Sequence, residues 1–156
     1  MTATRRRALS AGAALAGLVL VRPALAQSTD PGGELAAAVR QFTGGAPVQT
    51  GRVRLDIAQL VDNGNTVPMT VSVDSPMTAA DHVVALAVFN ERNPQREVIK
   101  ATLGPRAGKA QVATRIRLAT SQKLVAVARM SDGSHWQHTA DVIVTLAACI
   151  EGDVVQ

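Results

Sequence analysis

Aromatic residues and cysteine are scarce in this chain of 156 residues. It has no tyrosine and one cysteine, and only 2% of its residues are aromatic, whereas 47% are hydrophobic. A core built from this composition is aliphatic. The three aromatic side chains, Phe42, Phe89 and Trp136, are too few to form the stacking platform on which proteins hold single-stranded nucleic acid.

An excess of basic residues is also missing beyond residue 26, although the formal net charge of the whole sequence is +4. Four of the 16 basic residues lie within residues 1–26, which contain no acid, so twelve bases and twelve acids remain in the rest of the chain. No basic stripe is left that could neutralise phosphates. We therefore expect no nucleic-acid partner.

Residues 1–26 have the three parts of an export signal. An arginine cluster, Arg5–Arg7, precedes an apolar run, Ala11–Val21, and the small residues of Ala24–Ala26 form a cleavage site. The paired arginines and the Ala- and Gly-rich run favour the twin-arginine route, with an ordinary secretory signal as the alternative. We expect a mature protein that begins near Gln27, works in the periplasm and has no membrane-spanning segment, because no later apolar run reaches about 20 residues.

Two hydrophobic periods follow the signal. Apolar residues recur at helical spacing from Gly33 to Phe42, which predicts a short amphipathic helix that ends at Gly44. From residue 53 the period changes to two, and turn residues separate the alternating segments. The expected strands are, in chain order, Val53–Ile57, Val67–Val73, His82–Phe89, Glu97–Thr102, Val112–Leu118, Lys123–Met130 and His135–Leu146.

About seven strands at regular spacing are typical of an all-β fold. We predict an immunoglobulin-like antiparallel β-sandwich with a short N-terminal helix, in one domain that spans residues 33–146. A tail, residues 147–156, follows the last strand.

The motifs of common enzymes and metal sites are absent from the sequence. It has no nucleophile elbow, no phosphate-binding glycine loop, and no HExxH or CxxC motif, so we expect neither an enzyme nor a bound cofactor. A metal site remains an alternative, because three histidines and three methionines could supply ligands. We interpret Met69 and Met130 as core filler and the histidines as edge or surface residues; the candidate set is His82, His135, His138, Met69, Met77 and Met130.

Cys149, the only cysteine, lies three residues beyond the last predicted strand. Structural cysteines of exported proteins usually occur in pairs, so a single one suggests a reactive thiol or an intermolecular link. The alternative is a buried cysteine that acts as a small hydrophobic residue. Its position alone leaves both interpretations open.

Several segments, taken together and in order, resemble the SoxY family, the sulfur-carrier subunit of bacterial periplasmic thiosulfate oxidation. The resemblance covers most of residues 33–146 and is carried by Asp62–Pro68, Val71–Thr78, Asp81–Val83, Thr114–Ala119 and Val125–Gly133. It implies a carrier without catalytic activity that pairs with a second β-sandwich protein, SoxZ. It also implies that Cys149 carries the sulfur intermediate covalently and enters the active sites of a cytochrome and a hydrolase in turn.

The tail departs from the family pattern, in which two glycines stand on each side of the cysteine. Here alanines precede Cys149, Ile150 and Glu151 follow it, and the chain continues to Gln156. Glycine allows positive φ angles and close backbone approach, and an alanine in that conformation costs about 1–2 kcal/mol. Three hypotheses follow: a carrier with altered partner engagement, a SoxY-like assembly subunit that has lost the carrier arm, or a periplasmic metal-binding sandwich.

Overall fold

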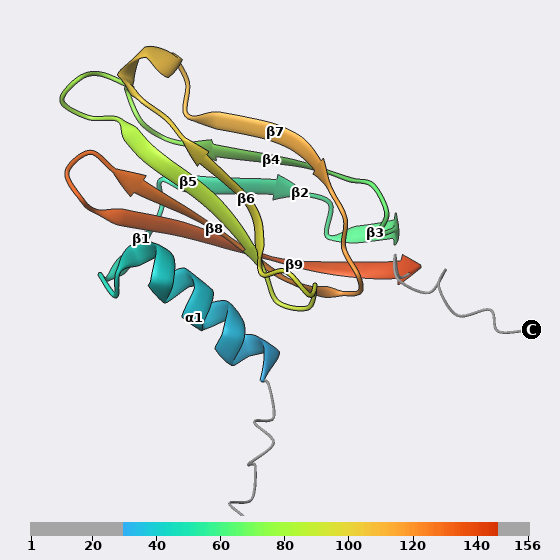
Figure 1. The fold of residues 1–156 in the computed structure, drawn as a ribbon. Helices are drawn as coiled ribbons and strands as arrows, with labels where there is room; N and C mark the ends of the chain where they lie inside the picture. The colour runs from blue at the N-terminus through green and yellow to red at the C-terminus, as the bar shows by residue number, and fades with distance from the viewer. Residues whose placement is uncertain (1–29, 147–156) are drawn as a thin grey trace, which may run out of the picture.

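The computed structural model describes residues 30–146, so the predicted export signal and the tail with Cys149 lie outside the described residues. One helix, one 3₁₀ turn and nine strands form the described part (Figure 1). Their bounds are α1 Pro31–Thr43, β1 Val48–Thr50, β2 Val53–Ile57, β3 Leu60–Asn63, β4 Val67–Val73, β5 Val83–Asn90, β6 Glu97–Thr102, the 3₁₀ turn Pro105–Ala107, β7 Gln111–Ile116, β8 Gln122–Met130 and β9 His135–Leu146.

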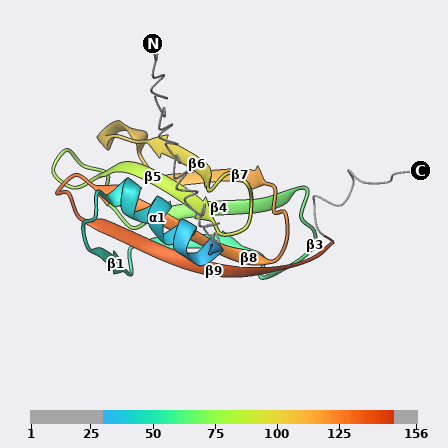
Figure 2. The ribbon, with the colours of Figure 1, turned by 60° about the horizontal axis from the view of Figure 1, so that its bottom comes forward.

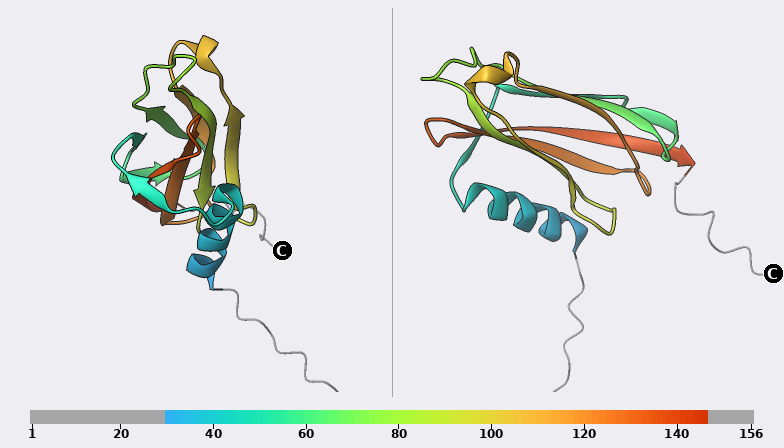
Figure 3. Two further views of the ribbon diagram at one scale, coloured as in Figure 1. Left: turned by 90° about the vertical axis from the view of Figure 1, so that its left-hand side faces the viewer. Right: turned by 45° about the horizontal axis from the view of Figure 1, so that its top comes forward.

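The strands form two facing sheets, which confirms the predicted β-sandwich. The larger sheet has the order β1-β9-β8-β5-β6, with β3 also paired to β9, and the smaller has the order β2-β4-β7. Within the larger sheet β5, β6, β8 and β9 pair antiparallel, as do all strands of the smaller one. Figure 3 shows the layers from two further sides, with α1 outside the sandwich.

The core between the sheets is aliphatic, as the composition predicts. Alternate residues of β4 are buried, from Val67 to Val73, because successive side chains of a strand point to opposite faces. β5 and β8 lie in the middle of the larger sheet and are buried along almost their whole length, which confirms the prediction of a central covered strand at residues 82–89. Met69 and Met130 fill this core, with 2% and 1% of their surface exposed.

The helix covers the outer face of the larger sheet. Asp30 caps its first turn, since the carboxylate accepts a hydrogen bond from the Gly32 amide at 3.2 Å, and Gly44 ends it with a φ of 64°. Figure 2 shows α1 lying across this sheet, where it contacts β5 and β8. Leu35 packs there into a second, smaller core with Phe89 and Val125, so both faces of the central strands are covered.

Two short strands are absent from the sequence-based prediction, and both pair with β9 in parallel. β1 pairs with the beginning of β9, where Val48 lies opposite His135, and β3 pairs with its end, where Asn63 lies opposite Leu146. The larger sheet is therefore mixed rather than purely antiparallel. No helix among residues 30–146 is long and apolar enough to cross a membrane.

Candidate functional site at the end of β9

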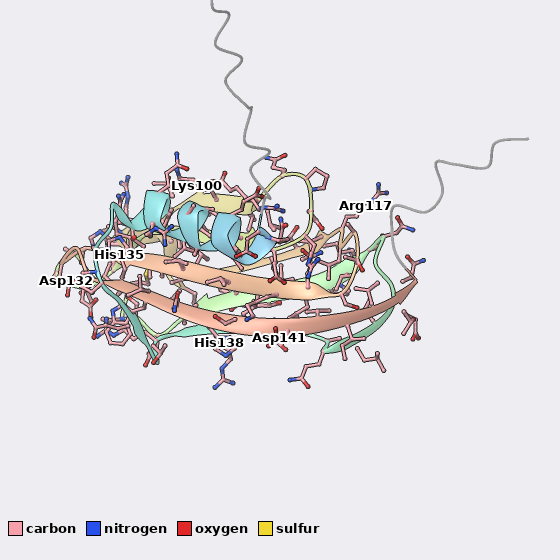
Figure 4. The ribbon with its side chains drawn as sticks, turned by 90° about the horizontal axis from the view of Figure 1, so that it is seen from below. Lys100, Arg117, Asp132, His135, His138 and Asp141 are labelled. Carbon is pink, nitrogen blue, oxygen red and sulfur yellow. The ribbon has the colours of Figure 1, made fainter. Side chains whose placement is uncertain are left out.

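Cys149, the residue expected to carry sulfur, lies outside the described residues, but the strand that leads to it is described to Leu146. The end of β9 therefore fixes where the tail leaves the sandwich. In Figure 4 Arg117 lies close to this end, whereas Asp132 and His135 lie at the opposite one. The surroundings of this exit are the part of the candidate site that the structure describes.

Backbone and side-chain hydrogen bonds hold the end of β9 on both edges. On one edge the Ile143 amide donates to the Gln59 carbonyl at 2.8 Å, and the Thr145 hydroxyl donates to the Asp62 carbonyl at 3.1 Å. On the other edge the Ser121 hydroxyl accepts from the Val144 amide at 2.8 Å and donates to its carbonyl at 3.3 Å. The tail thus leaves from a fixed position.

Gly64, which follows β3, packs closely against the backbone of Leu118 in the connection between β7 and β8. The Leu118 amide donates to the Gly64 carbonyl at 2.8 Å. A Cβ atom on residue 64 would lie 2.2 Å from the Leu118 carbonyl oxygen and 3.1 Å from a methyl group of Val144. Only glycine fits here, so the turn predicted at residues 62–65 also serves as a packing contact.

A network of amide side chains joins two further turns at the same end of the sandwich. Asn93 donates to the Arg117 carbonyl at 2.8 Å and accepts from the Ala119 amide at 2.9 Å, and Gln122 donates to Asn93 at 2.8 Å. Asn90, 1% exposed, accepts from the Asn93 amide at 2.9 Å. These residues are not recognisable from the sequence, because an asparagine in a turn gives no signal of its distant partners.

The only large apolar side chains classed as exposed between residues 30 and 146 also lie near this end. Leu60 is 62% exposed and Ile143 is 58% exposed, and the two residues are partners in the parallel pairing of β3 with β9. The exposed large apolar surface of residues 30–146 is therefore confined to this one pair. Asp141, two residues before Ile143, lies along the same strand in Figure 4.

The histidines do not form a metal centre in the described structure. Within residues 30–146, no three side chains of His, Cys, Asp or Glu come together as a group that could hold a metal ion. The His138 Nδ1 atom accepts a hydrogen bond from the Leu55 amide at 3.1 Å, and the His82 Nδ1 atom lies 3.0 Å from the Thr78 carbonyl oxygen. Each ring is thus held by its own local contact.

His135 corrects the expectation that all three histidines lie at edges or on the surface. It is only 5% exposed, because β1 and α1 cover the beginning of β9, and its ring stands edge-on to that of Phe42 at 6.4 Å. Neither ring nitrogen has a hydrogen-bond partner among the described residues. Burial lowers the pKa of His135, and the positive charge of Arg129 lowers it further.

A family model described as "Sulfur oxidation protein SoxY" matches residues 39–149, and this range includes Cys149. The chain belongs to the SoxY family. This membership confirms the resemblance that the sequence segments indicated. No curated protein gives a significant match to the sequence.

Solved structures share the fold of this SoxY-family chain. The sulfur carrier protein SoxY from Chlorobium limicola f. thiosulfatophilum superposes with a TM-score of 0.63 and 23% identity, covering 74% of this chain and 95% of the other. A superoxide reductase (neelaredoxin) from Ignicoccus hospitalis gives a TM-score of 0.54 at 16% identity, covering 62% and 94%. One from Nanoarchaeum equitans gives 0.52 at 12%, covering 62% and 100%. At these identities the likeness is one of fold.

Proposed function

We propose that this SoxY-family chain is a periplasmic sulfur carrier that holds thiosulfate-derived intermediates covalently on Cys149. The observation that supports this best is the extent of the family match, which runs to residue 149, the only cysteine of the chain. The chain acts as a carrier and not as a catalyst. Its export by the twin-arginine route, directed by residues 1–26, is part of the proposal.

Cysteine suits the chemistry because its sulfur forms and breaks S–S bonds and supports several oxidation levels. In the loading step the Cys149 thiol joins the outer sulfur of thiosulfate, one proton is released, and a cytochrome partner accepts two electrons. In the next step water attacks the terminal sulfonate with the help of a hydrolase, which releases sulfate and leaves a persulfide on Cys149. Electron-accepting partner proteins then take up six electrons as the outer sulfur of the persulfide is oxidised to a sulfonate with oxygen from water. Hydrolysis releases this group as sulfate and restores the Cys149 thiol.

The geometry of the β9 end supports this role. A carrier must offer its thiol at a defined place and still let it enter a second protein. The hydrogen bonds of Ile143, Val144 and Thr145 define the place from which the tail leaves, and Cys149 follows only three residues after Leu146. A SoxZ-like protein is the proposed permanent partner, and the cytochrome and the hydrolase dock transiently.

The residues around Cys149 are the reason for a competing proposal. Alanines replace the glycines that would ease entry into a narrow channel, and Glu151 with Asp153 adds negative charge that repels dianionic thiosulfate. A SoxY-family subunit that assembles with a partner but carries no sulfur would fit these replacements. The kept cysteine favours the carrier.

The intact mass of the protein separates the two proposals. The chain and its Cys149→Ser variant are isolated from thiosulfate-grown cells under non-reducing conditions and weighed by mass spectrometry. We expect sulfane or thiosulfonate adducts on the original chain that a reducing agent removes and that the serine variant lacks. A bare thiol under all growth conditions would contradict the carrier and favour the assembly subunit.

A further inference from the structure

The two exposed apolar residues near the end of β9 form one continuous feature. Leu60 and Ile143 are direct partners across the β3–β9 pairing, so their side chains stand on the same face of the sheet. Val61 and Val144, the next partners along these strands, pack into the core instead. Single exposed hydrophobic residues are common, but this pair is fixed side by side on hydrogen-bonded strands.

A hollow of about 420 Å³ lies next to the pair, between β2 and β9. Its apolar lining comes from Leu55, Ile57, Ala140 and Ile143, and its polar lining from Gln59, His138, Thr139 and Asp141. An apolar side chain of another protein can therefore contact Ile143 and at the same time enter the hollow. Such a small, partly recessed apolar contact is typical of the central anchor of a protein interface.

The length of the tail determines which protein can reach this patch. Cys149 follows Leu146 by three residues, and three extended residues span at most about 10 Å. Ile143 precedes Leu146 by three residues of strand, which is again about 10 Å. An enzyme whose active site receives Cys149 must therefore lie against this end of the sandwich, within reach of Leu60 and Ile143.

The charges around Leu60 and Ile143 help to decide what binds there: the tail of this chain, a second copy of the chain, or another protein. Asp62 and Asp141 stand two positions from Leu60 and Ile143 on the same strands, and Lys123 is the partner of Asp141 on β8. The Glu91 carboxylate accepts from the Lys123 amide at 3.2 Å and lies 3.9 Å from the Arg92 guanidinium, so it adds no unpaired charge. Asp62 and Asp141 are the charged residues next to the pair on its own two strands, so the acidic tail segment with Glu151 and Asp153 and the same face of a second copy are both repelled. A partner with basic residues around an apolar side chain is complementary.

We propose that Leu60 and Ile143 form the docking anchor for the enzymes that act on the sulfur bound to Cys149, and that these enzymes present an apolar side chain with a basic rim. This inference rests on the proposed carrier function. It identifies the surface on the described fold to which the enzymes of the proposed cycle bind. We expect the enzymes of the cycle to share this surface, because the short tail keeps Cys149 within reach of it.

The rate of loading tests the anchor. The full mature chain and its Leu60→Ser/Ile143→Ser variant are incubated with thiosulfate and a periplasmic extract of thiosulfate-grown cells, and adduct formation on Cys149 is followed by intact mass. At low carrier concentration we expect the variant to load about tenfold more slowly, because the anchor of the encounter is lost. Alkylation of Cys149 by iodoacetamide is expected at an unchanged rate, since the thiol itself is untouched.

Charge variants test whether the docking enzymes surround their apolar side chain with basic residues. Asp62→Lys/Asp141→Lys is expected to slow loading and to weaken its dependence on salt, whereas Asp74→Lys, at the opposite end of the sandwich, leaves both unchanged. Loading of the Leu60→Ser/Ile143→Ser variant at the original rate overturns the anchor and leaves the carrier function standing. The anchor is also overturned if that variant no longer elutes with a SoxZ-like subunit on size exclusion, because Leu60 and Ile143 then belong to the interface with that subunit. If the original chain takes up no sulfur, the carrier function fails and the anchor with it.

Discussion

His135 is the residue whose environment departs most from what its position in the sequence indicates. It is the first residue of β9 and directly follows the turn between β8 and β9, so the sequence favours an exposed position. In the structure β1 and the end of α1 cover it, and both ring nitrogens are buried without a partner among the described residues. An unpartnered buried imidazole is tolerated while it is neutral and disfavoured when it is charged.

The stability of the fold should therefore fall in mild acid. The pKa of His135 in the folded protein lies below the ordinary value of 6.5, so the unfolded chain binds the proton first as the pH drops. Its contribution to stability is complete above pH 6.5 and is lost as the pH falls from there toward the lowered pKa. We expect His135→Phe to flatten the change of melting temperature between pH 7.5 and 5, and to be as stable as the original chain or more so at pH 7.5.

A histidine in a different setting provides the control for that measurement. His82 is partly exposed and its ring lies against the Thr78 carbonyl oxygen. His82→Gln therefore shows how the loss of another imidazole affects the change of melting temperature between pH 7.5 and 5. If the melting temperature of His135→Phe fell as steeply between pH 7.5 and 5 as that of the original chain, the buried ring would not be the cause of the fall.

At the scale of elements, the β3–β4 connection holds the base of the tail. β3 is only four residues long, yet it pairs with the last residues of β9 and is tied to the turn before β8 through Gly64 and Leu118. A strand this short has little stability by itself, so its position depends on that contact.

Replacing Gly64 by alanine should destabilise this connection. The new Cβ would lie 2.2 Å from a backbone oxygen, which cannot rotate away as a side chain can. We expect a loss of about 1–3 kcal/mol in the free energy of unfolding, measured by urea denaturation. Gly104→Ala is the matched control, since nothing lies within 4 Å of its Cβ position and its φ of −152° suits any residue. Equal stability of the two variants would contradict the role of Gly64.

The sequence predicts elements well where local alternation and turns agree. β2, β4, β6 and β9 have the expected bounds, and the helix is two residues longer at its start and one at its end. β1 and β3 were missed because three or four residues give no period, and because their only partner, β9, is distant in sequence. The same reason hides the burial of His135 and the Asn93 network, which both arise from tertiary neighbours.

At the scale of the whole molecule, residues 30–146 offer a permanent partner only two large apolar side chains that are more than half exposed. A stable heterodimer buries about 800 Å² of each protein, far more than Leu60 and Ile143 can supply. Most of the interface with the proposed SoxZ-like subunit must therefore come from other residues of the sandwich.

We expect a SoxZ-like protein from the same cells to elute with the mature chain as one complex on size exclusion, and the Leu60→Ser/Ile143→Ser variant to keep this complex. A superoxide reductase of the same fold, such as that of Ignicoccus hospitalis, is the control and should elute separately. Separate elution of the SoxZ-like protein would contradict the proposed pairing.

In the proposed carrier cycle, the three residues from Leu146 to Cys149 limit the order of events, because they span at most about 10 Å. This reach is less than the radius of gyration of about 13 Å of a domain of 100 residues, so two enzymes would not fit around the thiol together. On this proposal each enzyme leaves before the next arrives, and the rate of the cycle is no higher than the rate of departure. A contact made by only two apolar side chains is weak enough for a docked enzyme to dissociate quickly. The small size of the proposed anchor therefore favours a high rate of the cycle.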